Sequence, residues 1–268
     1  MKLVFVVKYD KEESWQFDGV DAYWGTRSLA AIVQIFLLVI HASVNEEIVV
    51  QAPSAKGFRV VLGKSRDGSW EQLIHLAVTD PAVLNLLSDL GKDALYDILK
   101  WAMLSGVGVP FVIKNRRAKK RIRQLEMDVE DLQERLGQSI KEAHLPVKNQ
   151  GLKISVMGGR TILAEFDRTT LEYLETEILE DEQEVIYVGV SRFNARTGWG
   201  RCIEGMDAVS VPFSPSAPLS KAQKGRLAEN LRSIARGDFR VLPLIVSRVV
   251  AANGALKRYR LHGLPAVD

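Results

Sequence analysis

Hydrophobic and polar positions in the first part of the chain predict strands and two helices. Residues 2–7 are mainly apolar and either β-branched or aromatic, which is typical of a strand. Leu29 to Val44 is apolar except at a few positions, among them Gln34 and His41, and predicts a buried central helix capped by Thr26 or Ser28. This stretch is shorter than the roughly 20 residues that a membrane span needs.

Turn residues mark the elements that follow. Asp67-Gly68 predicts a hairpin between the strands 58–62 and 69–77, because glycine tolerates a positive φ. Asp80-Pro81 predicts the start of a second helix, since aspartate caps helices and proline suits their first turn.

Residues 112–143 predict a long helix with a coiled-coil seam. The aliphatic residues of the seam are spaced three and four apart, and they are Ile122, Leu125, Val129, Leu132 and Leu136. A seam of about two heptads is marginal alone, so it needs a partner or packing against the body of the protein. We expect self-association through this helix.

The last part of the chain predicts hairpins around Gly158-Gly159 and Asn253-Gly254, another over residues 185–204, and a basic helix over 220–235. Small barrels of the SH3 or OB type are candidates. The predicted fold class is therefore α+β. It comprises an N-terminal mixed α/β domain (1–110), the charged helix (111–147) and a C-terminal β-rich, small-barrel-like domain (148–268).

The composition and the short motifs exclude several kinds of functional site. The only cysteine, Cys202, excludes an intramolecular disulfide and a cysteine-based zinc site and suits a reducing cytoplasm. Gly63-Lys64-Ser65 departs from the phosphate-binding loop pattern, because the upstream Gly57 is one position too far away. The histidines are scattered without metal-ligand spacing, so we expect no metal and no cofactor.

Charge is distributed unevenly although the net charge is only +3. Seven of the ten residues 114–123 are basic, and five of the nine residues 126–134 are acidic. This order opposes the helix macrodipole, which favours acids first. Three interpretations stay open: a solvated connector, an antiparallel partner helix, or phosphate contact through Arg116, Arg117, Lys119 and Lys120.

The C-terminal part is also polarised. Residues 185–268 contain 13 basic and 5 acidic residues, whereas residues 151–184 contain 3 basic and 9 acidic residues. Aromatic residues interleave with the cations, and such strands can stack bases while pairing phosphates. The candidate nucleic-acid residues of this part are Arg192, Arg196, Trp199, Arg201, Arg258, Tyr259 and Arg260. A sheet with one apolar and one charged face is the competing interpretation.

Several short motifs carry a resemblance. Phe17-Asp18-Gly19, Tyr23, Ser28-Leu29 and Asp67-Gly68-Ser69-Trp70 resemble the N-terminal half of an uncharacterised family of bacterial two-domain proteins, over about the first hundred residues. The resemblance implies no activity and transfers no catalytic residue.

The sequence favours a non-catalytic, homo-oligomeric binding or assembly protein with an anionic partner, either nucleic acid or an acidic protein, in the cytoplasm. A role in conflict between bacteria and phages is a further hypothesis. One alternative is a hydrolase or nuclease whose dispersed, metal-dependent site gathers Asp18, Asp21, Glu47 and His75. Another is a small-ligand sensor with its pocket between the domains.

Overall fold

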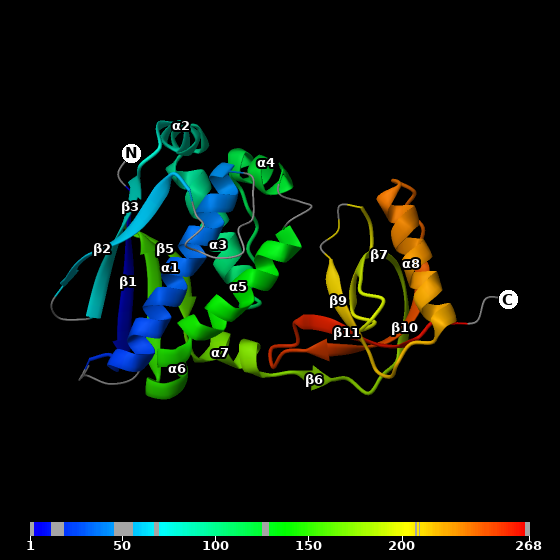
Figure 1. The fold of residues 1–268 in the computed structure, drawn as a ribbon. Helices are drawn as coiled ribbons and strands as arrows, with labels where there is room; N and C mark the ends of the chain where they lie inside the picture. Colours follow the sequence, from blue (N-terminus) through cyan, green and yellow to red (C-terminus); the bar gives the residue numbers. More distant parts are fainter. Residues whose placement is uncertain are drawn as a thin grey trace. The chain divides into compact units, whose positions relative to one another are not determined.

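The computed structural model describes residues 3–11, 19–45, 56–66, 70–124, 129–206, 208 and 210–265. The chain divides into two compact units, residues 1–174 (unit 1) and 175–268 (unit 2). Each unit is described by itself (Figure 1).

Unit 1 is built on a five-stranded antiparallel sheet with the order β2-β3-β1-β4-β5. Its strands are β1 (Leu3–Lys11), β2 (Phe58–Arg66), β3 (Trp70–Val78), β4 (Leu152–Gly158) and β5 (Thr161–Phe166). Side chains alternate along β1, so that Phe5, Val7 and Tyr9 are buried while their neighbours are half-buried. This period of two leaves one face of the sheet for helices to cover.

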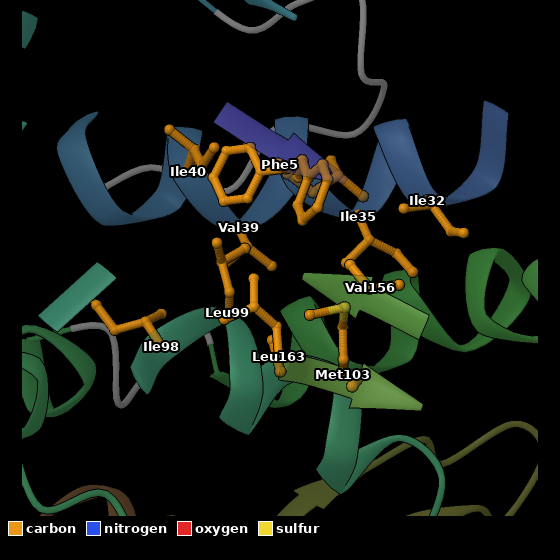
Figure 2. Packing of buried hydrophobic residues seen from close by; sticks show 14 of the residues in the cluster. Phe5, Ile32, Ile35, Val39, Ile40, Ile98, Leu99, Met103, Val156 and Leu163 are labelled. Carbon is orange, nitrogen blue, oxygen red and sulfur yellow. The ribbon is translucent and has the colours of Figure 1, made fainter. Parts of the chain in front are cut away.

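Helices cover that face and complete the core of unit 1. They are α1 (Ala22–Asn45), α2 (Pro81–Leu90), α3 (Lys92–Ser105), α4 (Arg116–Gln124), α5 (Val129–Ala143), α6 (Leu145–Gln150) and α7 (Arg168–Glu175). Figure 2 shows Phe5 of β1 packed beside α1, with Leu99 and Met103 of α3 in the same hydrophobic cluster. Val156 of β4 and Leu163 of β5 close the same core.

The central helix α1 is buried, as the apolar run predicts, but it begins earlier than expected. The Asp21 carboxylate accepts hydrogen bonds from the backbone N–H groups of Tyr23 and Trp24, at 2.9 and 3.0 Å. Asp21 therefore caps the helix in place of Thr26 or Ser28. By length and hydropathy alone α1 is apolar enough to cross a membrane, yet 72% of its most apolar window is buried inside the structure.

The boundary predicted after residue 147 is wrong, because β4 and β5 belong to the first unit. β4 pairs with β1 over seven residue pairs, from Phe5↔Gly158 to Lys11↔Leu152. Residues 152–166 thus complete the sheet that the N-terminal strand begins, and the units divide at 174/175. The local pattern of β4 contains no information about a partner strand about 150 residues away.

The predicted helix 112–143 is observed as α4 and α5, with residues 125–128 outside the described part. Leu132 and Leu136 are 1% exposed and lie in the core of unit 1, where α5 packs against α1. Ile122 is half-buried against the same core. Leu125 and the side chain of Val129 lie outside the described residues. The described leucines are therefore packed inside their own unit and do not form an exposed seam. Self-association itself stays a prediction.

Unit 2 contains a closed five-stranded barrel. Its elements are β6 (Ile178–Leu179), β7 (Glu184–Phe193), β8 (Gly200–Ile203), β9 (Val211–Pro215), α8 (Lys221–Ala235), β10 (Leu242–Val250) and β11 (Leu256–Gly263). The order runs β7-β8-β9-β11-β10, β10 pairs back with β7, and β6 adds a short edge to β10. β9 and β11 are parallel, and α8 connects β9 to β10.

This connectivity corresponds to the OB type of barrel, one of the two candidates from the sequence. The predicted basic helix over 220–235 is observed as α8, and the hydroxyl of its N-cap residue Ser220 accepts a hydrogen bond from Gln223 N in a capping box. The α+β class, with a mixed N-terminal region and a C-terminal barrel, is confirmed.

Candidate nucleic-acid interface

Trp199, just before β8, and Arg201 within β8 point to the outside of the barrel. Cys202 is 1% exposed in the core of unit 2, and a Cβ at Gly200 would lie 2.4 Å from the Phe213 ring. These two positions therefore face inward, and the alternating positions face outward. Trp199, which precedes β8, is 52% exposed.

The loop 194–199 is ordered by its own hydrogen bonds, which fixes the place of Trp199. The Asn194 side chain accepts from Arg196 N and Thr197 N at 3.0 and 3.2 Å, and Asn194 N donates to Trp199 O at 2.8 Å. Gly198 has a φ of +79°, and a Cβ there would press on Pro215. The turn thus needs glycine, and it presents the indole before any ligand arrives.

Arg201 lies opposite Arg192 across the β7–β8 pair. Arg201 is held in place because its Nε donates to Ser210 Oγ at 2.7 Å and its Nη2 to Ser210 O at 2.9 Å. The arginine is therefore positioned in advance for an anion.

The strand β11 brings Arg258 to Trp199. The Arg258 guanidinium carbon lies 5.9 Å from the centre of the Trp199 ring, a cation–π contact. Arg260 is half-buried and its Nη2 lies 3.5 Å from Ser216 O. The outer face of β8 and β11, with the 194–199 loop, thus combines an exposed indole with the guanidinium groups of Arg201, Arg258 and Arg260, and the loop itself contributes the exposed residue Arg196. We call it the Trp199 face.

Tyr259 is a correction to the predicted set. It is 7% exposed and belongs to the core of unit 2, and burial raises the pKa of its phenol above the ordinary value. A buried ring cannot stack on a base. The aromatic–cation spacing in this segment is explained by strand alternation, with Tyr259 inward and its arginine neighbours outward.

Acidic residues before the barrel contact cations on β10 and β11, among them Arg258 of the Trp199 face. Arg258 Nη2 lies 2.8 Å from the Glu177 carboxylate, and Lys257 Nζ lies 3.0 Å from Thr176 O and 4.0 Å from Glu177. Glu180 lies 4.0 Å from Arg248 on β10. Acidic residues of the segment 175–184 thus neutralise part of the basic charge within unit 2. The Glu177 contact was not predictable, because it joins positions 81 residues apart.

The basic block 114–123 lies on unit 1. The Asn115 side chain caps α4 through the N–H groups of Arg117 and Ala118. Ala118 is buried, whereas Arg116, Arg117, Lys119 and Lys120 are exposed. Arg117 donates to Asp89 O at 2.6 Å.

The predicted nuclease carboxylates receive no support as a site. Asp21 is a helix cap, His75 lies within β3, and Asp18 and Glu47 lie outside the described residues. Within the described ranges, no group of three His, Cys, Asp or Glu side chains could hold a metal ion. Gly63-Lys64-Ser65 lies within the hairpin, as predicted, but belongs to the strand β2, which continues past its predicted end at residue 62.

Comparison with known proteins agrees with the division at residue 174. No curated protein and no solved structure matches the chain. One family model matches residues 5–175, which is more than half of the chain and nearly coincides with unit 1. The chain therefore belongs to the family described as "Domain of unknown function (DUF7946)", whose domain makes up its N-terminal part.

Proposed function

We propose that this protein is a non-catalytic binding protein that holds single-stranded nucleic acid on the Trp199 face of its barrel. The observation that carries the proposal is the half-exposed Trp199, with Arg258 against its ring and Arg201 fixed beside it on the same strand face.

The topology of the barrel supports this choice of face. In OB barrels, the second and third strands and the loops after the first and fourth strands hold oligonucleotides or oligosaccharides. Here those elements are β8, β9, the 194–199 loop and residues 251–255. Topology alone does not imply function, so the weight rests on the side chains.

The chemistry of the face favours nucleic acid over an acidic protein. An exposed indole stacks on any base, and neighbouring arginines pair with phosphates, so the two together suit an unpaired strand. Carboxylates of an acidic protein would use the arginines but leave the indole without a partner. The bases of a duplex are stacked on each other and do not offer the indole a free ring face.

Self-association and a cytoplasmic location stay parts of the proposal. The thiol of Cys202, the single cysteine of the sequence, is buried, which is compatible with a reducing compartment. Several copies would multiply weak contacts with one strand by raising the effective concentration. Light scattering of the purified chain tests this part: a mass of about 30 kDa, that of one chain, would remove it.

The binding test is fluorescence anisotropy of a labelled single-stranded oligonucleotide titrated with the full chain at several salt concentrations. We expect Trp199→Ala to weaken binding about tenfold, because base stacking contributes about 1–3 kcal/mol. Arg196→Gln should lower the slope of log affinity against log salt by about one, as expected for one lost phosphate contact.

Tyr187→Ala is the matched control, because Tyr187 is 64% exposed on β7 but lies outside the Trp199 face. It should leave the affinity unchanged. Equal binding by the wild type and Trp199→Ala, or equal affinity for a duplex of the same length, would remove the proposed face.

A further inference from the structure

Unit 1 contains an open, basic hollow between α2 and α4. Its volume is about 600 Å³, and its lining includes Leu86 and Leu90 of α2 and Arg117, Lys120 and Arg121 of α4. A second hollow of about 300 Å³ adjoins it, shares Leu90 and Arg117, and adds Arg116 and Lys92. We call the two together the α4 hollow.

Positive charge dominates the lining. Five basic side chains face the α4 hollow, against the two carboxylates of Asp89 and Asp93. Among the residues that the structure describes, Arg116 and Lys120 have no carboxylate partner. Arg117 is held across the hollow by its 2.6 Å hydrogen bond to Asp89 O. Anion-binding groups are thus present and partly fixed.

The sequence of α4 opposes its own helix electrostatics. Arg116 and Lys120, and likewise Arg117 and Arg121, are like charges four residues apart, a spacing that destabilises a helix. The first turn contains no acid, although the positive end of the helix dipole favours one there. A bound anion would offset both costs, whereas a plain solvated helix would leave them uncompensated.

The lining also selects the class of anion. Arginine presents a planar fork that matches phosphate oxygens, and lysine adds a point charge. Leu86, which is 36% exposed, and Leu90 supply an apolar wall beside these cations. A ligand with a phosphate end and a flat, poorly hydrated end uses both parts. The volume is of the size that holds small molecules.

We infer that the α4 hollow binds a phosphorylated small molecule with a ring system, such as a free nucleotide. The phosphates of a nucleic-acid strand share this chemistry and are the other possible source. The inference concerns unit 1 alone and is independent of the Trp199 face, so either can fail without the other.

The test is isothermal titration of the full chain with ATP without added metal ions. Two double variants carry the same change in net charge. Arg116→Gln with Lys120→Gln removes two cations that line the hollow, and Lys119→Gln with Arg123→Gln removes two exposed cations of α4 outside the lining. Because all four side chains are exposed, both variants should keep the thermal unfolding midpoint of the wild type.

We expect the lining variant to bind ATP about tenfold more weakly, because it loses charge-assisted hydrogen bonds to phosphate, and the control variant to stay within about twofold. Adenosine, which has no phosphate, should not bind, and inorganic triphosphate should compete with ATP.

Three outcomes would overturn the inference. ATP could fail to bind the wild type, or both variants could weaken its binding equally, which would indicate diffuse attraction to a basic helix. The lining variant could also lose affinity for a single-stranded oligonucleotide while binding ATP as the wild type does. That last result would assign the hollow to strand phosphates instead.

Discussion

A single buried tyrosine links three elements of unit 1. Tyr9 Oη of β1 donates to Ser28 Oγ of α1 at 3.0 Å, and Ser28 Oγ donates to Ala143 O at the end of α5 at 2.7 Å. Burial raises the pKa of Tyr9 well above the ordinary value of about 10. The folded state therefore keeps a proton that the unfolded chain loses.

This difference predicts how stability depends on pH. Since the folded pKa is raised, the contribution of Tyr9 is complete below about pH 10 and is lost as the pH rises further. We expect the free energy of unfolding in urea to fall between about pH 9.5 and pH 11. Tyr9→Phe should make this fall shallower. Part of the fall should persist in the variant, because the pKa values of Tyr96, Tyr173 and Tyr259 are also raised in the folded protein. An identical slope in the variant would contradict the assignment.

A buried asparagine has a comparable role in unit 2. Asn230 Oδ1 of α8 accepts from Val190 N of β7 at 2.7 Å, and its Nδ2 donates to Arg240 O at 2.8 Å. Asn230→Ala leaves both backbone groups without partners, so it should lower the stability of the barrel by about 1–3 kcal/mol for each group. Denaturant unfolding measures the loss. Glu229→Ala, an exposed neighbour, should change stability by less than about 0.5 kcal/mol.

At the scale of elements, the acidic segment 175–184 is expected to limit ligand binding at the barrel. Glu177 occupies the Arg258 guanidinium that would otherwise pair with a phosphate. Glu177→Gln should tighten oligonucleotide binding about two- to fivefold at low salt, because an ion pair that is partly open to solvent contributes up to about 1 kcal/mol. The gain should shrink as salt screens the pair.

Glu182→Gln is the control for this prediction, because it removes one exposed acid of the same segment without removing the Arg258 contact. An equal gain in both variants would mean that only the overall charge matters. No gain from Glu177→Gln would mean that a phosphate does not reach Arg258.

Local patterns predicted most elements but not where all of them pack. The hairpins of unit 2 follow from turn residues, and the helix α8 follows from its amphipathic pattern; both signals act within a few positions. The placement of β4 depends on its pairing with β1, and the burial of Leu136 depends on α1. Both are long-range contacts that periodicity does not specify, so the stripe in α5 suggested a partner chain where the chain itself supplies the partner.

The candidate interface was predicted only in part, because some of its contacts are also long-range. Interleaved aromatic and basic residues marked Trp199, Arg201 and Arg258, which the structure gathers on one face. The pattern could not separate Trp199, exposed at the end of a loop, from the buried Tyr259 without the register of β11 against β9. The supporting contacts from Ser210 and Glu177 come from other segments and were missed.

For the whole molecule, two separate cores predict two cooperative units. The core of unit 1 ends at Phe166, and that of unit 2 runs from Val188 to Leu264, with no shared residue. Leu136→Ala should destabilise unit 1 by about 2–5 kcal/mol, the usual cost of truncating a buried leucine. Leu244→Ala, at an equally buried position of β10, should do the same to unit 2.

Amide hydrogen exchange distinguishes the two units. In Leu136→Ala, protection should fall across α1, α3, β1 and β4 while the strands of the barrel keep theirs, because local opening follows cooperative units. Oligonucleotide affinity should then survive, since the Trp199 face lies in unit 2. In Leu244→Ala the pattern should reverse and the affinity should drop. Loss of protection throughout the chain in both variants would show one cooperative unit, and it would follow that the Trp199 face depends on the whole protein for its shape.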